Sequence, residues 1–489
     1  MARKRATFFN HLSLCYHYQM LTYDEALDYL YSFVDYGLVR AEKYSPEVFN
    51  LTRMLAFVRA LGDPQRRYPV IHVAGTKGKG SVAALCTSAL RAGGYRTGFY
   101  TSPHLNDFRE RVQVNGEYIP RETLAEIISE FQTLVPQHPG VTTFELSTAL
   151  ALVYFARQNV DVAVIEVGLG GRLDATNVVT PLVSVISSLS YDHTYLLGNT
   201  LTEIATEKAG IIKPGVPVVT AAQQPEALAA LEQVAAERGA PLEYVGRDWH
   251  YRAVSHSLEL QRCEVWSAEE QRQLNALRAR GHTVNWRPTQ LELPLLGQHQ
   301  VENATLAYAA LQAARRQGLP LAADAIEAGF RQVVWPGRFE ILRRAPYVVV
   351  DGAHNADSAK RLAATVREYF PNKHVRLIFG ASSDKDVAGM LMELLTPAIG
   401  VAHVITTQAV HPRALEPEAL AELARPAGVP VETASTVEAA LEKALATASP
   451  DEVVLATGSL FVVAEVTAAL RELETRRTRR PGGAERVSQ

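Results

Sequence analysis

The segment from Pro69 to Arg91 constrains the fold more than any other part of the chain. An apolar run, 69–74, meets the loop Gly75-Thr-Lys-Gly-Lys-Gly-Ser81, and a helical pattern over 82–91 follows at once. Glycines let backbone N–H groups turn toward an anion, a helix N-terminus adds positive potential, and a lysine neutralises the outer phosphates. The order strand, glycine loop, helix therefore predicts an α/β domain with a polyphosphate site. Its residues are Gly75, Thr76, Gly78, Lys79, Gly80 and Ser81.

This loop departs from the common P-loop pattern, whose first glycine would fall at Val73. A tight turn before a helix is the alternative interpretation of the same glycines. Because Lys79 is followed directly by Gly80 and Ser81, we favour nucleotide binding.

Length and composition fit a globular enzyme. The chain has 489 residues, a formal net charge of −3 and three widely spaced cysteines, Cys15, Cys86 and Cys263. The length allows two large domains or about three smaller ones, and the charge favours neither a nucleic acid nor a membrane as a partner. The cysteine spacing supports neither a disulfide framework nor a cysteine metal site. Without an apolar run of about 18 residues or a signal-peptide pattern, we expect a cytoplasmic protein.

Short apolar runs alternate with helical periodicity, which predicts α/β architecture. In the first part, we expect strands at 70–74, 97–100, 162–167, 182–187 and 216–220, and helices at 123–134, 146–158, 201–209, 225–238 and 300–316. A second series follows, with strands at 347–351, 374–380, 403–407 and 452–456 and helices at 356–369 and 437–445.

The sequence Trp335-Pro-Gly-Arg338 separates these two series. We therefore place an N-terminal domain at 1–334 and a C-terminal domain at 335–475. The polar stretch 246–288 is predicted to be a surface insertion. The polar, Pro- and Gly-bearing tail 476–489 is predicted to be disordered.

Polar residues lie just past expected strand ends, where α/β sheets present their chemistry. Ser102 follows the strand that ends at Tyr100, and Glu166 ends an apolar strand in which an unpaired carboxylate is costly to bury. With His193, they form a candidate set of metal ligands. The alternatives are a Ser-Pro turn, a structural ion pair and an ordinary loop histidine. No His–His–carboxylate spacing favours zinc, and oxygen ligands beside phosphate favour Mg²⁺.

Taken together, the motifs resemble the folylpolyglutamate synthase/dihydrofolate synthase family of the Mur ligase superfamily. The resemblance runs from about Leu21 to Leu470. It rests on GTKGKGS (75–81), TSPHL (101–105), ERVQVNG (110–116), EVGLGGRLDATN (166–177), DH with LGNT and EKAGIIK (192–213), GQHQVENA (297–304), WPGRFE (335–340), DGAHN (351–355) and TGSLF (457–461).

The resemblance implies an N-terminal P-loop ATPase-like domain with a central, mostly parallel sheet and a smaller, Rossmann-like C-terminal α/β domain. It also implies roles for particular residues. Ser102, Glu166 and His193 are implied Mg²⁺ ligands, and Lys208 is an implied carbamylated lysine that helps to hold a second Mg²⁺. The implied catalytic residues are Lys79, Lys208, His193 and His354; the further nucleotide contacts are Asn303, Arg338, Asp351 and His354; the implied substrate contacts are Phe144, Asp174 and Ala175 for a pterin group and Ser459 near the active site.

The activity implied by the family is ATP-dependent ligation of L-glutamate to a folate-type carboxylate through an acyl phosphate. The substrates would be 7,8-dihydropteroate, reduced folates or both, and we expect both. The implied partners are small molecules only, with no nucleic acid or membrane, and the implied state is a monomer.

Lys77 stands where the family commonly has asparagine, and it receives no role at this point. Another Mur-type ligase is one alternative function, although 21–60 is short for a separate UDP-binding domain. A non-catalytic nucleotide-binding paralogue is another. A P-loop GTPase is disfavoured because no NKxD-type guanine motif is found.

Overall fold

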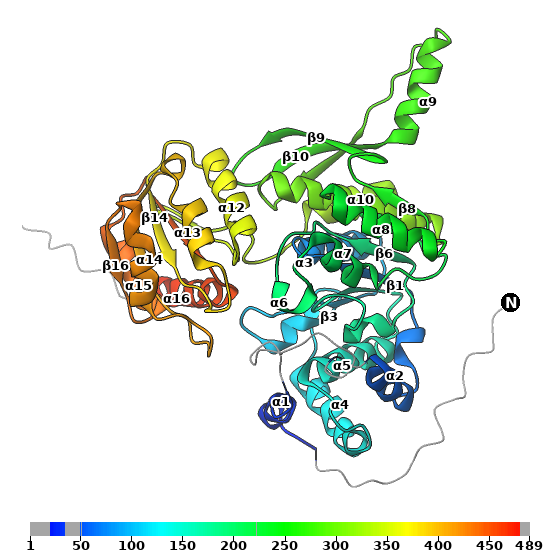
Figure 1. Cartoon of the computed structure of the whole chain (residues 1–489), viewed down its shortest axis with the longest axis horizontal. Coiled ribbons are helices and arrows are strands. Elements are labelled where there is room, and N and C mark those ends of the chain that lie inside the picture. Colours follow the sequence, from blue (N-terminus) through cyan, green and yellow to red (C-terminus); the bar gives the residue numbers. More distant parts are fainter. Residues whose placement is uncertain (1–19, 35–48, 50, 222, 480–489) are drawn as a thin grey trace, which may run out of the picture.

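The computed structural model describes residues 20–34, 49, 51–221 and 223–479 (Figure 1). The first sheet has eight strands in the order β4-β3-β2-β5-β1-β6-β7-β8. They are β1 (Val70–Ala74), β2 (Thr97–Tyr100), β3 (Val112–Val114), β4 (Glu117–Tyr118), β5 (Val162–Glu166), β6 (Val183–Ile186), β7 (Val218–Thr220) and β8 (Leu242–Tyr244). All neighbouring strands are parallel except at the β2–β3 and β3–β4 pairs.

Helices cover both faces of this sheet, which explains why its central strands are apolar without alternation. Ile71 and Val73 of β1 pack on one face, while Val70 belongs to the core of the other face. The helices of this part are α1 (Tyr23–Tyr31), α2 (Leu51–Ala60), α3 (Lys79–Ala92), α4 (Arg121–Leu134), α5 (Thr143–Arg157), α6 (Thr194–Leu197), α7 (Leu201–Ala209), α8 (Pro225–Glu237), α10 (Gln298–Arg316) and α11 (Ala323–Arg331). Short 3-10 turns lie at Pro64–Arg66, Phe108–Arg111, Val135–Gln137, Ala175–Val178, Pro397–Ile399 and Arg425–Ala427.

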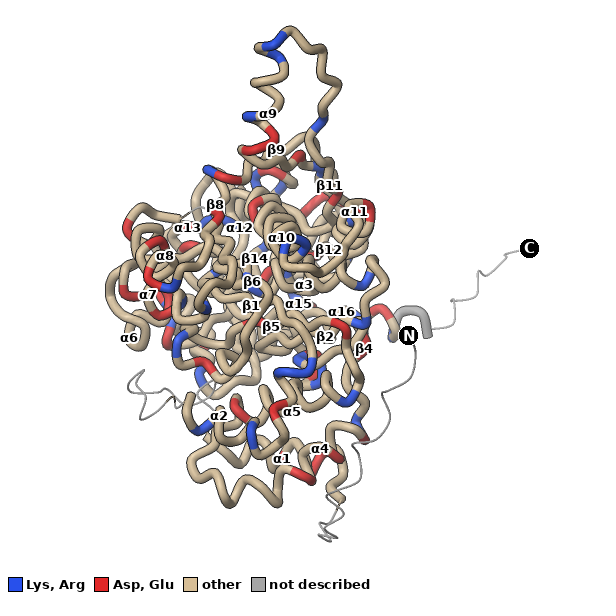
Figure 2. The backbone as a smooth tube through the Cα atoms, turned by 90° about the vertical axis from the view of Figure 1, so that its right-hand side faces the viewer, with Lys and Arg blue, Asp and Glu red and all other residues tan. Residues whose placement is uncertain are grey.

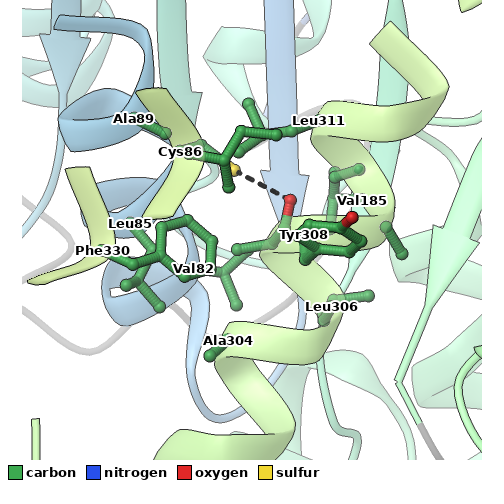
Figure 3. Close-up of a cluster of buried hydrophobic side chains, with 14 of the residues drawn as sticks. Val82, Leu85, Cys86, Ala89, Val185, Ala304, Leu306, Tyr308, Leu311 and Phe330 are labelled. Carbon is green, nitrogen blue, oxygen red and sulfur yellow. Dashed lines mark hydrogen bonds between the residues drawn. The ribbon is translucent and has the colours of Figure 1, made fainter. Parts of the chain in front are cut away.

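The core beside the phosphate loop is built by α3 and α10. Figure 3 shows Val82, Leu85 and Cys86 of α3 among Tyr308 and Leu311 of α10. The Cys86 Sγ donates to the Ala307 carbonyl oxygen at 3.9 Å. This packing fixes the first turn of α3, and therefore the glycine loop, against the sheet.

A second sheet, of order β11-β10-β9, is antiparallel. It contains β9 (Trp249–His256), β10 (Gln261–Ser267) and β11 (Thr289–Leu293), with α9 (Ala268–Ala279) inserted after β10. Trp249, Cys263 and Val265 are buried in the core that includes α10. This corrects the prediction of a surface insertion at 246–288 for its strand part, because these alternating apolar side chains cover α10.

The helical part of the same stretch does lie outside the body. Figures 1 and 2 both show α9 on an arm that extends beyond the other elements. Leu274 is the buried residue of α9. At the end of the β9–β10 hairpin away from the arm, the His256 ring contacts the ring of Tyr369, whose hydroxyl donates to Gln261 Oε1 at 3.1 Å. The small sheet therefore contacts both the first sheet's helical layer and the C-terminal part of the chain.

The third sheet has six strands in the order β12-β13-β17-β14-β15-β16 and is parallel except at the β12–β13 pair. The strands are β12 (Glu340–Arg344), β13 (Tyr347–Val350), β14 (Val375–Phe379), β15 (Val401–Thr406), β16 (Val431–Thr433) and β17 (Val453–Thr457). Two apolar clusters, one on each face, are covered by α12 (Ala356–Tyr369), α13 (Val387–Leu394), α14 (Pro417–Ala424), α15 (Val437–Thr447) and α16 (Leu460–Arg479).

The expected elements appear in the expected order, with ends that differ by a few residues. The largest shifts are at two helix starts: the helix expected from 82 begins at Lys79, and the helix expected from 146 begins at Thr143 because Thr142 and Glu145 form a capping box. The tail predicted to be disordered from 476 is corrected over its first residues, since α16 continues to Arg479; 480–489 lie outside the described residues. Within the described part, no helix is long and apolar enough to cross a membrane.

Candidate active site

The glycine loop joins β1 to α3 and depends on glycine at two points. Gly75 has φ 144° and Gly78 has φ 85°, both in the region that favours glycine. A Cβ at Gly78 would lie 2.3 Å from Asn303 Oδ1 of α10. The backbone N–H groups of Thr76 and Lys77 both donate to the Ser188 carbonyl oxygen, at 3.0 and 3.1 Å. The loop is therefore held by the end of β6 while α3 begins at its far side.

One cavity of about 240 Å³ lies at this loop and is lined by both large parts of the chain. The carboxyl ends of β1, β5 and β13 all lie at this cavity, which explains how residues far apart in the chain come together. The predicted site residues that line it are Gly75, Thr76, Gly78, Lys79, Gly80, Ser81, Ser102, Glu166, His193, Lys208, Asn303, Arg338, Asp351 and His354.

Glu166 ends β5 inside this cavity and is 5% exposed. The Thr101 hydroxyl donates to its Oε2, and the Ser102 backbone N–H approaches the same oxygen at 3.4 Å. Burial raises the pKa of the Glu166 carboxyl, while the nearby Lys79 ammonium opposes that rise. A carboxylate kept in such a place gains from a bound cation.

Lys208 lies near the end of α7, a helix that starts at the Thr200–Glu203 capping box. Its Nζ donates to the Gly75 carbonyl oxygen at 2.9 Å, so the amine touches the phosphate loop. The residue is 5% exposed. Burial, helped by the Lys79 charge, lowers the pKa of this amine to about 7. Near neutral pH, a large fraction of Lys208 is therefore an uncharged amine.

His193 follows Asp192 and enters α6 with φ 50°. Burial lowers the pKa of His193 to about 4, although Asp192 acts in the opposite direction. His193 is therefore neutral near pH 7 and has a lone pair free to bind a cation.

The candidate metal ligands Ser102, Glu166 and His193 all line the cavity. Across the described ranges, no group of three or more His, Cys, Asp or Glu side chains is arranged to hold a metal ion. A set made of a hydroxyl, a carboxylate and a neutral imidazole, next to a phosphate loop, fits Mg²⁺ because the phosphate oxygens and waters complete its coordination.

The C-terminal part contributes the loop after β13. The Asp351 carboxylate accepts from the Phe339 and Ala353 backbone N–H groups at 2.8 and 2.9 Å. Burial raises the pKa of Asp351, and the Arg338 charge opposes that rise. The His354 Nδ1 lies 2.8 Å from the Gly352 carbonyl oxygen, so this nitrogen carries the proton and Nε2 accepts.

Four predicted substrate residues do not line the cavity: Phe144, Asp174, Ala175 and Ser459. Phe144 packs on Gly168, where a Cβ would lie 2.4 Å from the ring. Asp174 is buried and accepts from the Leu169 and Thr176 backbone N–H groups, both at 2.9 Å. Both residues therefore support the loop after β5. The Ser459 Oγ accepts from the Phe461 N–H at 3.2 Å, at the start of α16.

Reasoning from the sequence missed a cluster of four residues in or beside the cavity, in which three side chains surround the Asp192 carboxylate. The sequence assigns Lys77 no role, and Asp192 enters only as part of the DH motif that begins at 192. Asn355 and Lys385 follow β13 and β14 in the C-terminal part. Their position after strand ends was the available signal, but nothing local shows that they meet Asp192.

Two family models match the chain: the Mur ligase middle domain over residues 73–311 and the Mur ligase glutamate ligase domain over residues 337–460. The Bacillus subtilis dihydrofolate synthase/folylpolyglutamate synthase is 36% identical over 368 residues, which cover 73% of this chain and 80% of that protein. The Escherichia coli protein of the same description is 34% identical over 414 residues, covering 85% and 88%. The chain belongs to the folylpolyglutamate synthase/dihydrofolate synthase family.

The chain spans about half the length of two haloarchaeal relatives. One of them, the probable bifunctional folylpolyglutamate synthase/dihydropteroate synthase of Haloferax volcanii, is 37% identical over 450 residues, covering 91% of this chain and 50% of that protein.

Solved structures of the family share this architecture. Escherichia coli FolC in complex with DHPP and ADP has 32% sequence identity and a TM-score of 0.78, over 94% of this chain and 99% of that chain. The folylpolyglutamate synthase of Thermotoga maritima has 34% identity and a TM-score of 0.75, over 93% and 96%. The family resemblance and the predicted α/β fold are thereby confirmed.

Proposed function

We propose that the protein is an ATP-dependent ligase that joins L-glutamate to a folate-type carboxylate, as a dihydrofolate synthase and as a folylpolyglutamate synthase. The observation that carries the proposal is the single cavity in which the phosphate loop and Lys208 face Arg338 and His354. A cavity of this kind can position two reactants between two domains and exclude water. Relatives described with both activities support the bifunctional form.

The proposed chemistry has two steps. A carboxylate oxygen of the folate-type substrate attacks the γ-phosphorus of ATP, and ADP leaves with the electrons of the broken P–O bond. The glutamate amine then attacks the acyl phosphate carbon, loses a proton, and inorganic phosphate departs as the amide forms. The first step brings a carboxylate against negatively charged phosphates, and the second brings a neutral amine to a crowded acyl carbon. Positioning and electrostatics therefore dominate catalysis.

The chain's own residues divide this work between the two large parts. In the N-terminal part, the loop from Gly75 to Ser81 would bind the phosphates, with Lys79 on the outer ones, and Asn303 of α10 would contact the nucleotide. Arg338, Asp351 and His354 would contact the nucleotide from the C-terminal part, and closure about Trp335 would exclude water. Phe144, Asp174 and Ala175 are proposed to bind the pterin group, and Ser459 is proposed to lie near glutamate.

Mg²⁺ would be held by Ser102, Glu166 and His193, and when bound it would offset the charge of the phosphates and the carboxylate. Lys208 is proposed to carry a carbamate that helps to hold a second Mg²⁺. Its pKa of about 7 supports this, because only the uncharged amine adds to CO₂. Magnetic resonance with isotopically labelled bicarbonate tests the carbamate: a carbamate carbon signal is expected, and it should be absent in Lys208→Met.

The proposal is tested by measuring ADP release with Mg·ATP and L-glutamate, adding 7,8-dihydropteroate or tetrahydrofolate separately. Mass spectrometry should find one added glutamyl unit on each substrate. Product from only one substrate would remove the bifunctional form. No product from either, with ADP binding intact, would overturn the ligase assignment in favour of a binding paralogue or another acceptor.

We also propose that the protein is a cytoplasmic monomer with small-molecule partners and that its chain is divided into two domains near Trp335. Light scattering of the purified protein tests the monomer, and proteolysis followed by mapping of the cleavage sites tests the domain boundary.

A further inference from the structure

The Asp192 carboxylate lies where the two large parts of the chain meet and accepts from both. Lys77 Nζ of the phosphate loop donates to its Oδ2 at 2.7 Å. From the C-terminal part, Asn355 Nδ2 donates to Oδ2 at 3.0 Å and Lys385 Nζ donates to Oδ1 at 3.2 Å. One carboxylate thus joins the loop before α3, the cap of α12 and the loop after β14.

The contacts are shielded from water. The side chains of Asp192, Lys77 and Lys385 are 10%, 12% and 16% exposed. Charge pairs at this depth are screened far less than surface pairs, and removing one partner leaves the others unpaired in a place where hydration is weak. The orientation of the Asp192 carboxylate is also set locally, because the His193 backbone N–H donates to its Oδ1 at 3.0 Å.

Lys77 is turned toward the C-terminal part. Besides Asp192, its Nζ approaches His354 Nε2 at 3.5 Å. His354 precedes Asn355, whose side chain accepts from the Ser358 N–H at 3.0 Å and so caps α12. The amine of Lys77 is thus committed to these groups, while Lys79 is the lysine that opens α3.

We propose that Asp192 is a positioning residue that clamps the two domains in the closed arrangement, with Lys77 holding its carboxylate and Lys385 and Asn355 providing the contacts across the domains. The clamp keeps Arg338, Asp351 and His354 opposite the phosphate loop before nucleotide binds. Its consequence for catalysis rests on the proposed function, but the clamp itself is a statement about domain closure.

The test measures closure directly. Spin labels at Glu226→Cys on α8 and Glu418→Cys on α14, both exposed positions, report the distance between domains in a Cys15→Ser background. Without nucleotide, the parent protein should give one narrow distance distribution. Asp192→Asn and Lys385→Gln should each broaden it toward longer distances, and Lys385→Arg should retain most of the parent distribution. Lys360→Gln, at an exposed lysine of α12, is the matched control and should change nothing.

Steady-state kinetics provide a second measurement of domain closure. An open ground state should raise the KM for ATP by about tenfold while kcat falls less than about threefold, because saturating ATP restores closure. The double variant Asp192→Asn/Lys385→Gln should show nearly the same KM as Asp192→Asn alone, because the Lys385 contact is already lost with the Asp192 carboxylate. Lys77→Gln, which leaves Asp192 and Lys385 in place, should give a smaller rise and guards against misfolding of the Asp192 variant.

Unchanged distance distributions in Asp192→Asn and Lys385→Gln would overturn the clamp, as would additive effects of the two substitutions. A fall in kcat with an unchanged KM would assign these side chains to the chemical step instead. If the distances change as expected but no variant and no parent protein forms product, the ligase assignment fails and the clamp stands.

Discussion

Replacing Lys208 by methionine should stabilise the fold while removing activity. The lysine is 5% exposed, and burial lowers the pKa of its amine from its usual 10.5 to about 7. In the unfolded chain the pKa returns to about 10.4. Between about pH 7 and pH 10.5 the unfolded state therefore binds more protons than the folded state. The lysine lowers the free energy of unfolding in this range, and below pH 7 it does so by the full amount.

The magnitude follows from that difference. At pH 7 the folded amine is half protonated, and the difference in its pKa between the folded and unfolded states then lowers the free energy of unfolding by about 4 kcal/mol. Methionine loses the hydrogen bond to the Gly75 carbonyl oxygen, which costs about 1 kcal/mol. Lys208→Met should therefore raise the free energy of unfolding by about 3 kcal/mol at pH 7 and by only about 1 kcal/mol at pH 9.

The assay is urea unfolding followed by circular dichroism in CO₂-free buffer, with the N-terminal transition analysed at both pH values. Lys360→Met, at an exposed lysine of α12, is the control and should change the unfolding free energy by less than about 0.5 kcal/mol. In the ligation assay, Lys208→Met should lose about 100-fold in rate. A variant that is no more stable than the parent at pH 7, or a gain of equal size at both pH values, would refute the burial argument.

Three further substitutions test the site and the core. Gly78→Ala places a Cβ 2.3 Å from Asn303 Oδ1, so calorimetry should show ADP binding weakened by about tenfold or more. Glu166→Gln should lower Mg²⁺-dependent ADP release about 100-fold without lowering Tm, since burial raises the pKa of this carboxyl and so disfavours its charge. Burial lowers the pKa of His72 to about 3, so only the unfolded chain is protonated between about pH 6.5 and pH 5, and stability falls there by about 2 kcal/mol. In His72→Gln, the slope of unfolding free energy against pH should decrease by about 1.4 kcal/mol per pH unit, and an unchanged slope would contradict this.

Much of the N-terminal architecture could be predicted because its signals are local. The apolar runs at β1 and β5 end where a glycine loop and Glu166 begin, and capping residues mark the starts of α5 and α7. The stretch that contains β9 and β10 was harder, since its exposed and buried residues alternate and its mean composition is polar. Trp249 and Cys263 belong to the core only because the strands lie on α10.

The candidate substrate residues also show that local sequence does not fix where a side chain points. Phe144 and Asp174 stand in motifs, but the structure turns them toward Gly168 and toward the loop N–H groups, outside the cavity at the phosphate loop. A motif names the residue type at a position and leaves the direction of the side chain open. Direction depends on the packing of α5 against the sheet, which involves residues from several parts of the chain.

The sequence by itself determined which residues end each strand, where the phosphate loop lies and which family the chain resembles, because these depend on neighbours within a few positions. Only the tertiary structure decided that Lys385 reaches Asp192, 193 residues away, and that Lys208 is buried deeply enough to lose much of its charge. Contacts across two sheets and the loss of hydration are properties of the packed molecule, and local patterns of residues do not encode them.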